Sequence, residues 1–280
     1  MRFHHVDVFA DGPYSGNSLA VFPDAAGLRP EQMAAITKEL RHFESIFLVG
    51  EAARVFDLDG ELDFAGHPVI GAACVLHALR GGAADATWTL RLPTRAVRVT
   101  TRRLASGRYN GVLDQGRPAF LGDADVADIL PRLSLLPDDL DPTLAPEIVS
   151  TGLAYLVLPV RGEALARARI TTDLTAPLAA LGAEFAYLLD AAGLEGRHWN
   201  NDGVVEDVAT GSGGGCAAAY LRRHDRIPDA VPTILRQGRF AGRPSELTVT
   251  AHGRPDDIRS IEVGGEVVLL ADGRLRELPR

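Results

Sequence analysis

Two titratable side chains near the start of the chain stand where they could exchange a proton with a small molecule. His67 lies between Gly66 and Pro68 in FAGHPVIGAACVLHALRGG, at the entrance of an Ala-rich apolar helix, and Glu44 lies in RHFESIFLV, where a helix meets a buried strand. A carboxylate held among apolar groups resists ionisation, so its pKa rises from about 4.3 toward the range of a general acid or base. Taken alone, His67 also fits a structural cap and Glu44 a surface carboxylate.

The segment VVEDVATGSGGGCAAAYL carries a second group of candidates. Glu206 and Asp207 are adjacent on a predicted strand, so their side chains face opposite ways and only one can point toward the glycines after them. Unpaired N–H groups at a helix start attract anions, which makes Gly211, Ser212 and Gly213 candidates for binding a carboxylate. The alternative is that Ser212 only caps the helix and the glycines only permit a sharp turn.

Other well-known motifs do not fit this chain. GSGGGC lacks the third glycine of the dinucleotide motif GxGxxG, no Walker lysine is present, and Thr210 stands where a nucleophile elbow GxSxG needs glycine. The 8 histidines lack HExxH spacing, and His4 and His5 are adjacent on a strand and point to opposite faces. We therefore expect no cofactor and no metal ion.

The composition indicates a globular chain that acts on a small molecule. Its 280 residues are 46% hydrophobic and 24% charged, enough for one large domain or two smaller ones. A net charge of -8 without a stripe of basic residues argues against nucleic acid, and no apolar run is long enough to span a membrane. Cys74 and Cys216 lie in Ala-rich runs without CxxC spacing, and no signal-peptide h-region is present, so we expect a cytoplasmic location.

Strands and helices alternate through the first part of the chain. Apolar spacing predicts strands at residues 3–8, 19–22 and 46–49 and a helix over residues 30–43. The stretch VFDLDGELDFAG predicts a hairpin in which Asp59 and Gly60 supply the positive φ angles of a tight turn. Strands in WTLRLP and RAVRVTT come next, and a Gly/Pro break near residues 116–118 suggests a domain boundary.

The second half repeats this order in a looser form. A strand pair around Gly152, a helix in LTAPLAALGAE and a strand in FAYLLD precede a strand, a glycine-rich turn and the helix GCAAAYLRRH, which echoes GAACVLHALR. Small residues let a helix sit inside a tightly curved sheet. We therefore predict an α/β (α+β) fold of two similar halves, each a strand barrel around a central helix. The halves are residues 1–117 and 118–280, with the last strand, about 265–280, able to return to the first half.

Across nearly its whole length the chain resembles the PhzF family of phenazine-biosynthesis-like isomerases. The matching stretches are VDVFADGPYSGNSLAVF, LRHFESIFLV, FAGHPVIGAACVL, LDQGRP, STGLAYLVLPV, EDVATGSGGGCAAAYL, QGRFAGRPSEL and VGGEVVLLADG. The resemblance implies the diaminopimelate epimerase-like fold, whose two pseudo-symmetric halves agree with the internal repeat described above.

The resemblance also implies a role for each matched position. Glu44, in the ET/ES motif, would be the acid/base that moves a proton on the substrate, while His67 in GHP and Asp207 in EDxxTGS would bind and polarise substrate groups. The residues implied to bind the substrate and its carboxylate are Gly66, Gly211, Ser212 and Gly213.

The chain departs from the related patterns at three places. Diaminopimelate epimerases and proline racemases place a cysteine in both motifs, but this chain has Thr210 in the second, and a hydroxyl is too weak an acid to replace a thiol. Within the PhzF-like pattern, Ser45 replaces the usual threonine after the glutamate. GRHWNNDG replaces the common Arg-Phe-x-Pro stretch ahead of the ED motif, which alters whatever that segment touches.

These observations predict a cofactor-independent isomerase that moves a proton within a small carboxylic acid and uses Glu44 as its acid/base. Two alternatives stay open, namely a cysteine-independent epimerase or lyase on the same fold, and a catalytically silent protein that only binds the small molecule. We also expect the chain to form a homodimer. The only other partner we expect is the small-molecule carboxylate substrate.

Overall fold

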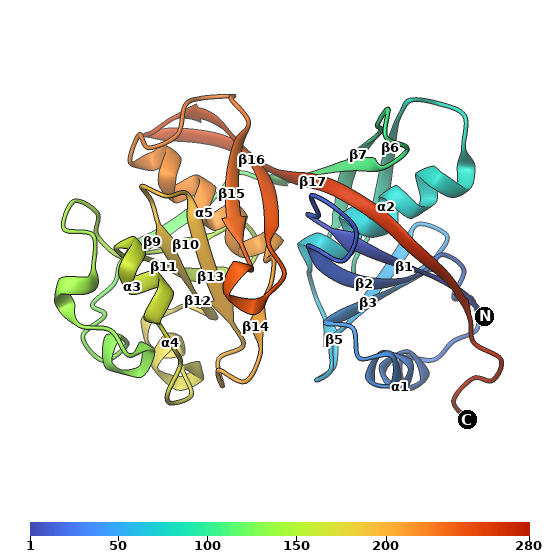
Figure 1. Cartoon of the computed structure of the whole chain (residues 1–280), viewed down its shortest axis with the longest axis horizontal. Coiled ribbons are helices and arrows are strands. Elements are labelled where there is room, and N and C mark those ends of the chain that lie inside the picture. The colour runs from blue at the N-terminus through green and yellow to red at the C-terminus, as the bar shows by residue number, and fades with distance from the viewer. The chain divides into compact units, whose positions relative to one another are not determined.

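The computed structural model describes residues 1–280, which form two compact units (Figure 1). One unit comprises Met1–Asp114 together with Gly264–Arg280, and the other comprises Gln115–Val263. The C-terminal segment from Gly264 onward therefore belongs to the same unit as the N-terminus.

The first unit is mostly strands, with two helices. Its helices are α1 (Pro30–Leu40) and α2 (Gly66–Arg80). Its strands are β1 (Arg2–Val8), β2 (Asn17–Phe22), β3 (Glu44–Val49), β4 (Ala52–Phe56), β5 (Glu61–Leu62), β6 (Asp85–Arg91), β7 (Ala96–Arg103), β8 (Tyr109–Gly116) and β17 (Asp257–Arg274), the last two of which continue past the boundary of the unit.

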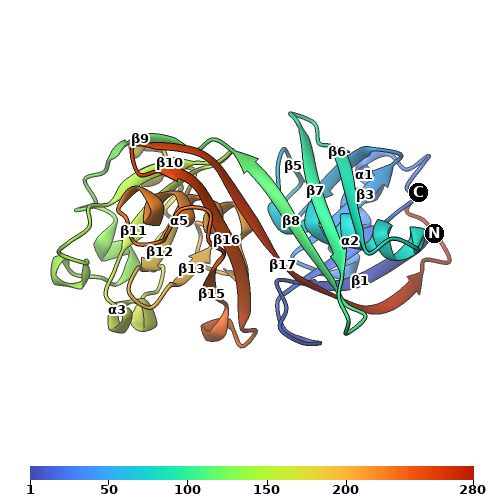
Figure 2. The ribbon, with the colours of Figure 1, turned by 90° about the horizontal axis from the view of Figure 1, so that it is seen from above.

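Eight of these strands close into a barrel. Hydrogen bonds join β17, β1, β2, β3, β4, β6, β7 and β8 in that order, and β8 pairs with β17 to complete the ring. Figure 2 shows β8 and β17 side by side at this closure. The pairs β2–β3 and β4–β6 are parallel, and the other neighbours for which the register is given are antiparallel.

The second unit has eight strands of its own and three helices. The helices are α3 (Gly162–Arg167), α4 (Thr175–Leu181) and α5 (Gly211–Arg223). The strands are β9 (Ala119–Asp123), β10 (Glu147–Ser150), β11 (Ala154–Pro159), β12 (Phe185–Asp190), β13 (Glu195–Trp199), β14 (Glu206–Asp207), β15 (Thr233–Gln237) and β16 (Ser245–Arg254).

The two units repeat one pattern of strand order and direction. In the first unit the order β1–β2–β3–β4–β6–β7 runs antiparallel, parallel, antiparallel, parallel, antiparallel. In the second, β10–β11–β12–β13–β15–β16 runs through the same sequence of directions. Each unit also adds a two-residue strand, β5 or β14, directly before its longest helix. The predicted fold of two pseudo-symmetric halves is confirmed.

Each long helix packs against the inner face of its own sheet. Helix α2 contacts β1, β2, β3, β6 and β7, while α5 contacts β10, β11, β12 and β16. Little room remains for side chains, because a Cβ atom on Gly71 of α2 would come within 2.5 Å of Leu19, and one on Gly215 of α5 within 1.9 Å of the Gln115 amide. The small residues of both helices are therefore required by close packing.

The other face of each sheet is covered by short helices. Met33 and Ile36 of α1 pack on Phe22, Phe47 and Phe56 in the first unit. Leucine and alanine side chains of α3 and α4 cover β11 and β12 in the second. Because side chains alternate along a strand, the residues between these positions face the long helix instead.

Three local predictions are wrong in detail. Helix α1 ends at Leu40, since Arg41 adopts a left-handed conformation, so Phe43 is outside it. The 57–60 turn has no positive φ at Asp59 or Gly60; instead Asp57 Oδ1 accepts hydrogen bonds from both backbone N–H groups, at 2.8 and 2.7 Å. The glycines at 211 and 213–215 form the first turns of α5 rather than a loop before it.

No helix has the combined length and hydrophobicity needed to cross a lipid bilayer.

Candidate active site

Glu44 and His67 meet on the inner face of the first unit. Glu44 is the first residue of β3, where it pairs with Leu19 of the parallel strand β2, and His67 is the second residue of α2. Both are buried, at 7% and 3% exposure, and Glu44 Oε2 lies 3.6 Å from His67 Nδ1. Gly66 begins the helix beside them, after the extended backbone of Ala65.

The geometry of this pair suits proton transfer. A separation of 3.6 Å is within ion-pair range but longer than the roughly 3.2 Å limit of an ordinary N–H···O hydrogen bond. The imidazole and the carboxylate are therefore close enough to interact electrostatically. A buried carboxylate beside a titratable ring is a typical arrangement for a general acid or base.

In the second unit a hydrogen-bonded turn holds Asp207 beside the start of α5. Asp207 Oδ2 accepts a hydrogen bond from Thr210 Oγ1 at 2.5 Å, and Gln237 Nε2 donates to Thr210 Oγ1 at 2.9 Å and to the Asp207 carbonyl at 2.8 Å. Tyr187 donates its hydroxyl hydrogen to Gln237 Oε1 at 3.1 Å. This network fixes Asp207, which is only 4% exposed, in one conformation.

Glu206 points away from this network, as the alternation of strand side chains requires. Its two carboxylate oxygens accept hydrogen bonds from Arg197 Nε and Nη2 at 2.8 and 2.7 Å. Of the two adjacent carboxylates, Asp207 therefore lies at the helix start and Glu206 forms an ion pair on the other side of β14.

Ser212 is the second residue of α5 and does not cap it. Thr210 occupies the cap position with an extended backbone, and Ser212 Oγ instead lies 2.8 Å from the hydroxyl of Tyr155. Gly211, Ser212 and Gly213 form the first turn, whose N–H groups have no acceptor within the helix. An anion placed there would meet these donors together with the positive end of the helix dipole.

The cysteines lie in the interiors of the two long helices. Cys74 and Cys216 are fully buried, and burial raises the pKa of both thiols, that of Cys216 to about 12. Neither thiol can ionise near neutral pH, so thiol-based proton transfer is unsupported.

The internal repeat shows how the two units differ chemically. The second residue of the long helix is His67 in one unit and Ser212 in the other. Strand β3 of the first unit corresponds to β12 of the second, because Glu44 pairs with Leu19 of β2 just as Phe185 pairs with Tyr155 of β11. The position of Glu44 is therefore occupied by Phe185 in the second unit. The first unit thus carries a titratable pair where the second carries a hydroxyl and an aromatic ring.

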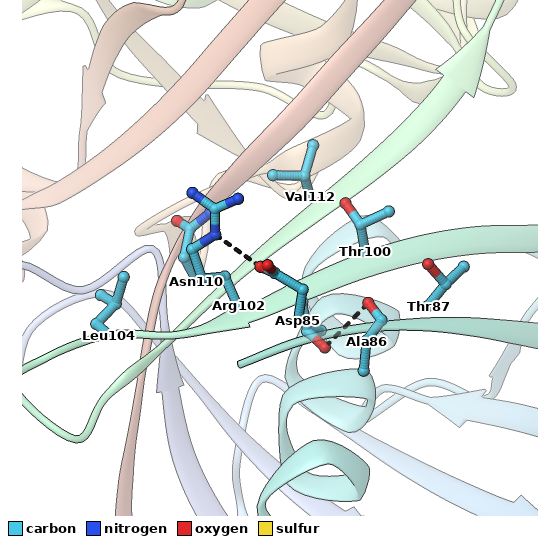
Figure 3. A pocket seen from close by; sticks show the side chains of 9 residues that line it. Asp85, Ala86, Thr87, Thr100, Arg102, Leu104, Asn110 and Val112 are labelled. Carbon is cyan, nitrogen blue, oxygen red and sulfur yellow. Dashed lines mark hydrogen bonds and ion pairs between the residues drawn. The ribbon is translucent and has the colours of Figure 1, made fainter. Parts of the chain in front are cut away.

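A separate hollow of about 680 Å³ lies over strands β6, β7 and β8 of the first unit (Figure 3). It is lined by threonine side chains, Asn110, Val112 and the exposed ion pair of Asp85 with Arg102, whose atoms are 2.7 Å apart. None of the residues predicted for the site lines this hollow. No cluster of three or more His, Cys, Asp or Glu side chains is arranged to hold a metal ion.

The structure groups the predicted residues by unit. Glu44, Gly66 and His67 lie together in the first, and the other four lie in the β14–α5 segment of the second, namely Asp207, Gly211, Ser212 and Gly213. The sequence analysis assigns no role to Tyr155, His198 or Gln237, which lie around that segment, although STGLAYLVLPV contains Tyr155 and QGRFAGRPSEL begins with Gln237. His198 lies in GRHWNNDG, the stretch that differs from the common Arg-Phe-x-Pro pattern. That difference by itself does not predict that His198 lies on a strand and faces α5.

A family model described as phenazine biosynthesis-like protein matches residues 6–273 of the chain. Trans-2,3-dihydro-3-hydroxyanthranilate isomerase from Pseudomonas fluorescens is 32% identical over an alignment of 288 positions, and the alignment covers 96% of this chain and 97% of the relative. A solved structure described as a predicted epimerase from Pseudomonas aeruginosa is 47% identical, covers 99% of both chains and superposes with a TM-score of 0.92. A PhzF-family phenazine biosynthesis protein from Bacillus anthracis, 21% identical, superposes with a TM-score of 0.84 over 98% of both chains and supports the fold.

Proposed function

The chain belongs to the phenazine biosynthesis-like protein family and is an isomerase, and from this premise we propose that it moves a proton within a small carboxylic acid without a cofactor. The buried pair of Glu44 and His67, 3.6 Å apart, is the observation that carries this proposal. A carboxylate that is shielded from water and lies beside a titratable ring can take a proton from carbon and return it before the solvent exchanges it.

In this proposal the first unit supplies proton transfer. The Glu44 carboxylate removes a proton from a carbon of the substrate, the electron pair of that C–H bond moves into the adjacent unsaturated system, and the same proton is returned at another carbon. His67, 3.6 Å from the Glu44 carboxylate, polarises the substrate, and the N–H of Gly66 at the helix start adds a donor.

The second unit has an anion-binding segment of its own. The first-turn N–H groups of Gly211, Ser212 and Gly213 suit a carboxylate, and the network around Thr210 and Gln237 fixes Asp207 beside them. This segment binds carboxylates of the substrate's class, and its affinity for them does not depend on Glu44.

Epimerisation is the second candidate, because the 47% identical solved structure is described as a predicted epimerase. Inverting a carbon centre generally uses two acid/base groups on opposite faces of the substrate. Cys216 is buried with a pKa raised to about 12, and the cap of α5 carries the hydroxyl of Thr210. The absence of an ionisable thiol, with the Asp207 carboxylate held by the Thr210 hydroxyl, therefore favours isomerisation by Glu44.

The test is to run the reaction in deuterium oxide and weigh the product by mass spectrometry. Trans-2,3-dihydro-3-hydroxyanthranilate, the compound in the names of the Pseudomonas relatives, is the first substrate to try. We expect less than one deuterium per product molecule, because the shielded carboxylate returns the proton it took. One full deuterium at every stage of conversion would contradict internal transfer, and inversion without movement of a double bond would favour epimerisation.

We also propose that the enzyme works as a homodimer in the cytoplasm. The first proposal keeps the expectation stated from the sequence, and the two buried, unbridged cysteines fit a reducing compartment. Light scattering coupled to size-exclusion chromatography measures the mass directly; a single-chain mass of 29.9 kDa would contradict the dimer.

A further inference from the structure

His198 is a buried imidazole on the inner face of the second unit, opposite Asp207. It belongs to β13, is 5% exposed, and pairs across the antiparallel β13–β14 ladder with Asp207. Side chains that are directly opposite in such a ladder lie on the same face and within a few ångströms of each other. The next residue along, Trp199, packs in the outer core cluster, which places His198 on the side of α5.

The internal repeat indicates that the fold itself does not need a polar group here. In the first unit the equivalent β4–β5 ladder pairs Val55 with Leu62. The positions match because Leu62 lies four residues before the start of α2, and Asp207 lies four residues before the start of α5. An aliphatic pair therefore suffices to build this corner of the fold. The second unit has His198 and Asp207 in place of Val55 and Leu62, and it is also the unit whose long helix carries Ser212 in its first turn.

The hydrogen bonds of His198 define which ring nitrogen can accept a proton. Its Nδ1 lies 2.9 Å from the carbonyl oxygen of Ala186, which can only accept, so Nδ1 carries the hydrogen. Nε2 then carries a lone pair that can accept a hydrogen bond. Burial lowers the pKa of His198, although the charge of Asp207 and the bond to Ala186 act in the opposite direction, so the ring is neutral near pH 7.

The neighbours of His198 connect it to the binding segment. Its ring makes edge contacts with Tyr155 and Phe185, each with a centroid separation of 5.5 Å. Tyr155 in turn is hydrogen-bonded to Ser212 at 2.8 Å. The ring packing holds the imidazole in one orientation, opposite Asp207 and in contact with Tyr155, the hydrogen-bond partner of Ser212.

We propose that His198 is a specificity-determining residue, whose Nε2 accepts a hydrogen bond from an amino or hydroxyl group of the carboxylate substrate. This inference rests on the proposed function, because it assumes that Asp207 and Ser212 bind that substrate. A site with a buried acceptor discriminates against a ligand that lacks the donor, since the acceptor is then left without a partner.

The test compares two ligands and two isosteric variants. 3-Hydroxyanthranilate carries amino and hydroxyl donors beside its carboxylate, and benzoate carries neither. His198→Asn keeps an N–H at the position of Nδ1 but removes Nε2, whereas His198→Gln places an amide that can accept near the position of Nε2. Calorimetry gives both affinities for each protein, and thermal unfolding verifies that each variant is folded.

We expect the wild-type protein to bind 3-hydroxyanthranilate roughly tenfold or more tightly than benzoate, the typical value of one buried hydrogen bond. In His198→Asn the ratio should fall toward one while benzoate affinity changes little, and His198→Gln should restore part of it. An unchanged ratio in His198→Asn, or a wild-type protein that binds neither ligand or binds both equally, would overturn the role of His198. The rate measurement on Glu44 tests the proposed function independently of this outcome.

A measurement on the unaltered protein covers the case in which the variants do not fold. In protein labelled with ¹⁵N at histidine, 3-hydroxyanthranilate should shift the Nε2 resonance of His198 and leave Nδ1 protonated. Benzoate should shift it much less. Equal shifts with both ligands would contradict the proposal.

Discussion

Replacing Arg197 with methionine is expected to lower the free energy of unfolding of the second unit by about 3–5 kcal/mol, the usual loss on breaking a buried ion pair. The side chains of Arg197 and Glu206 are 5% and 14% exposed, and two short hydrogen bonds join them. Arg197 Nη1 also donates to the carbonyls of Leu165 and Ala168, at 2.7 and 3.2 Å, near the end of α3. Methionine fills the space but leaves a buried carboxylate and these carbonyls without their donor.

The first unit supplies a matched control for this substitution. Arg54 Nε and Nη2 bond to Glu61 at 2.6 and 2.5 Å, in the equivalent β4–β5 position, but the side chains are 33% and 28% exposed. Exposed pairs contribute at most about 1 kcal/mol, so Arg54→Met should cost far less than Arg197→Met. The comparison holds the chemistry of the pair constant and changes its burial.

Urea unfolding can follow each unit separately, because the chain has 2 tryptophans, Trp88 in the first unit and Trp199 in the second. A Trp88→Phe background leaves fluorescence from the second unit alone, and the slope of the transition reports whether unfolding remains cooperative. A loss below about 1 kcal/mol for Arg197→Met, or equal losses for the two arginines, would refute the reasoning from burial.

Three further predictions concern the thiols, the pH dependence and the close packing of a glycine. Replacing Cys74 or Cys216 with serine should leave turnover within a few-fold of wild type, because buried thiols with raised pKa values do not transfer protons. A drop in turnover of about 1,000-fold in Cys216→Ser alone, as expected for a lost acid/base, would contradict this. The lowered pKa of His198 means that the unfolded state binds its proton first, so stability should fall as the pH drops below about 6.5, by up to ~1.4 kcal/mol per pH unit. Urea titrations between pH 7 and 5 should show a shallower decline for His198→Asn, and identical slopes would count against a buried neutral ring. Gly71→Ala should destabilise by roughly 1–3 kcal/mol through overpacking, whereas Gly60→Ala, with open space around it, should be nearly neutral; equal thermal shifts for the two would disprove the packing argument.

Regular periodicity made the class of the fold predictable from the sequence. The alternation of apolar residues in the strands and the two Ala-rich helices, with their similar small residues, sufficed to predict two similar halves. The glycines at 213–215 were misassigned to a turn because glycine has low helix propensity. Their place in α5 depends on tertiary packing, since Tyr187, Leu247 and Gln115 occupy the space that side chains would need.

The candidate site was predictable only where a motif marked it. Glu44, His67 and Asp207 stand in recognisable motifs, and their roles remain proposals. His198 has no motif, and the stretch STGLAYLVLPV does not by itself distinguish Tyr155 from its neighbours. The importance of both residues arises from strand register: His198 pairs with Asp207, and Tyr155 reaches Ser212 from a different strand. Such relations between distant segments depend on the pairing of strands, which single-sequence periodicity does not determine.

The rate of Glu44→Gln under single-turnover conditions tests the central claim most directly. Trans-2,3-dihydro-3-hydroxyanthranilate is the first substrate to use. The control is Glu51→Gln, which changes an exposed glutamate just beyond the end of the same strand. If Glu44 is the acid/base, turnover should fall by ~10²–10⁴-fold while the affinity for the substrate stays close to wild type. The control should retain full activity. A Glu44→Gln enzyme that turns over within a few-fold of wild type would contradict the claim and remove this residue from the mechanism.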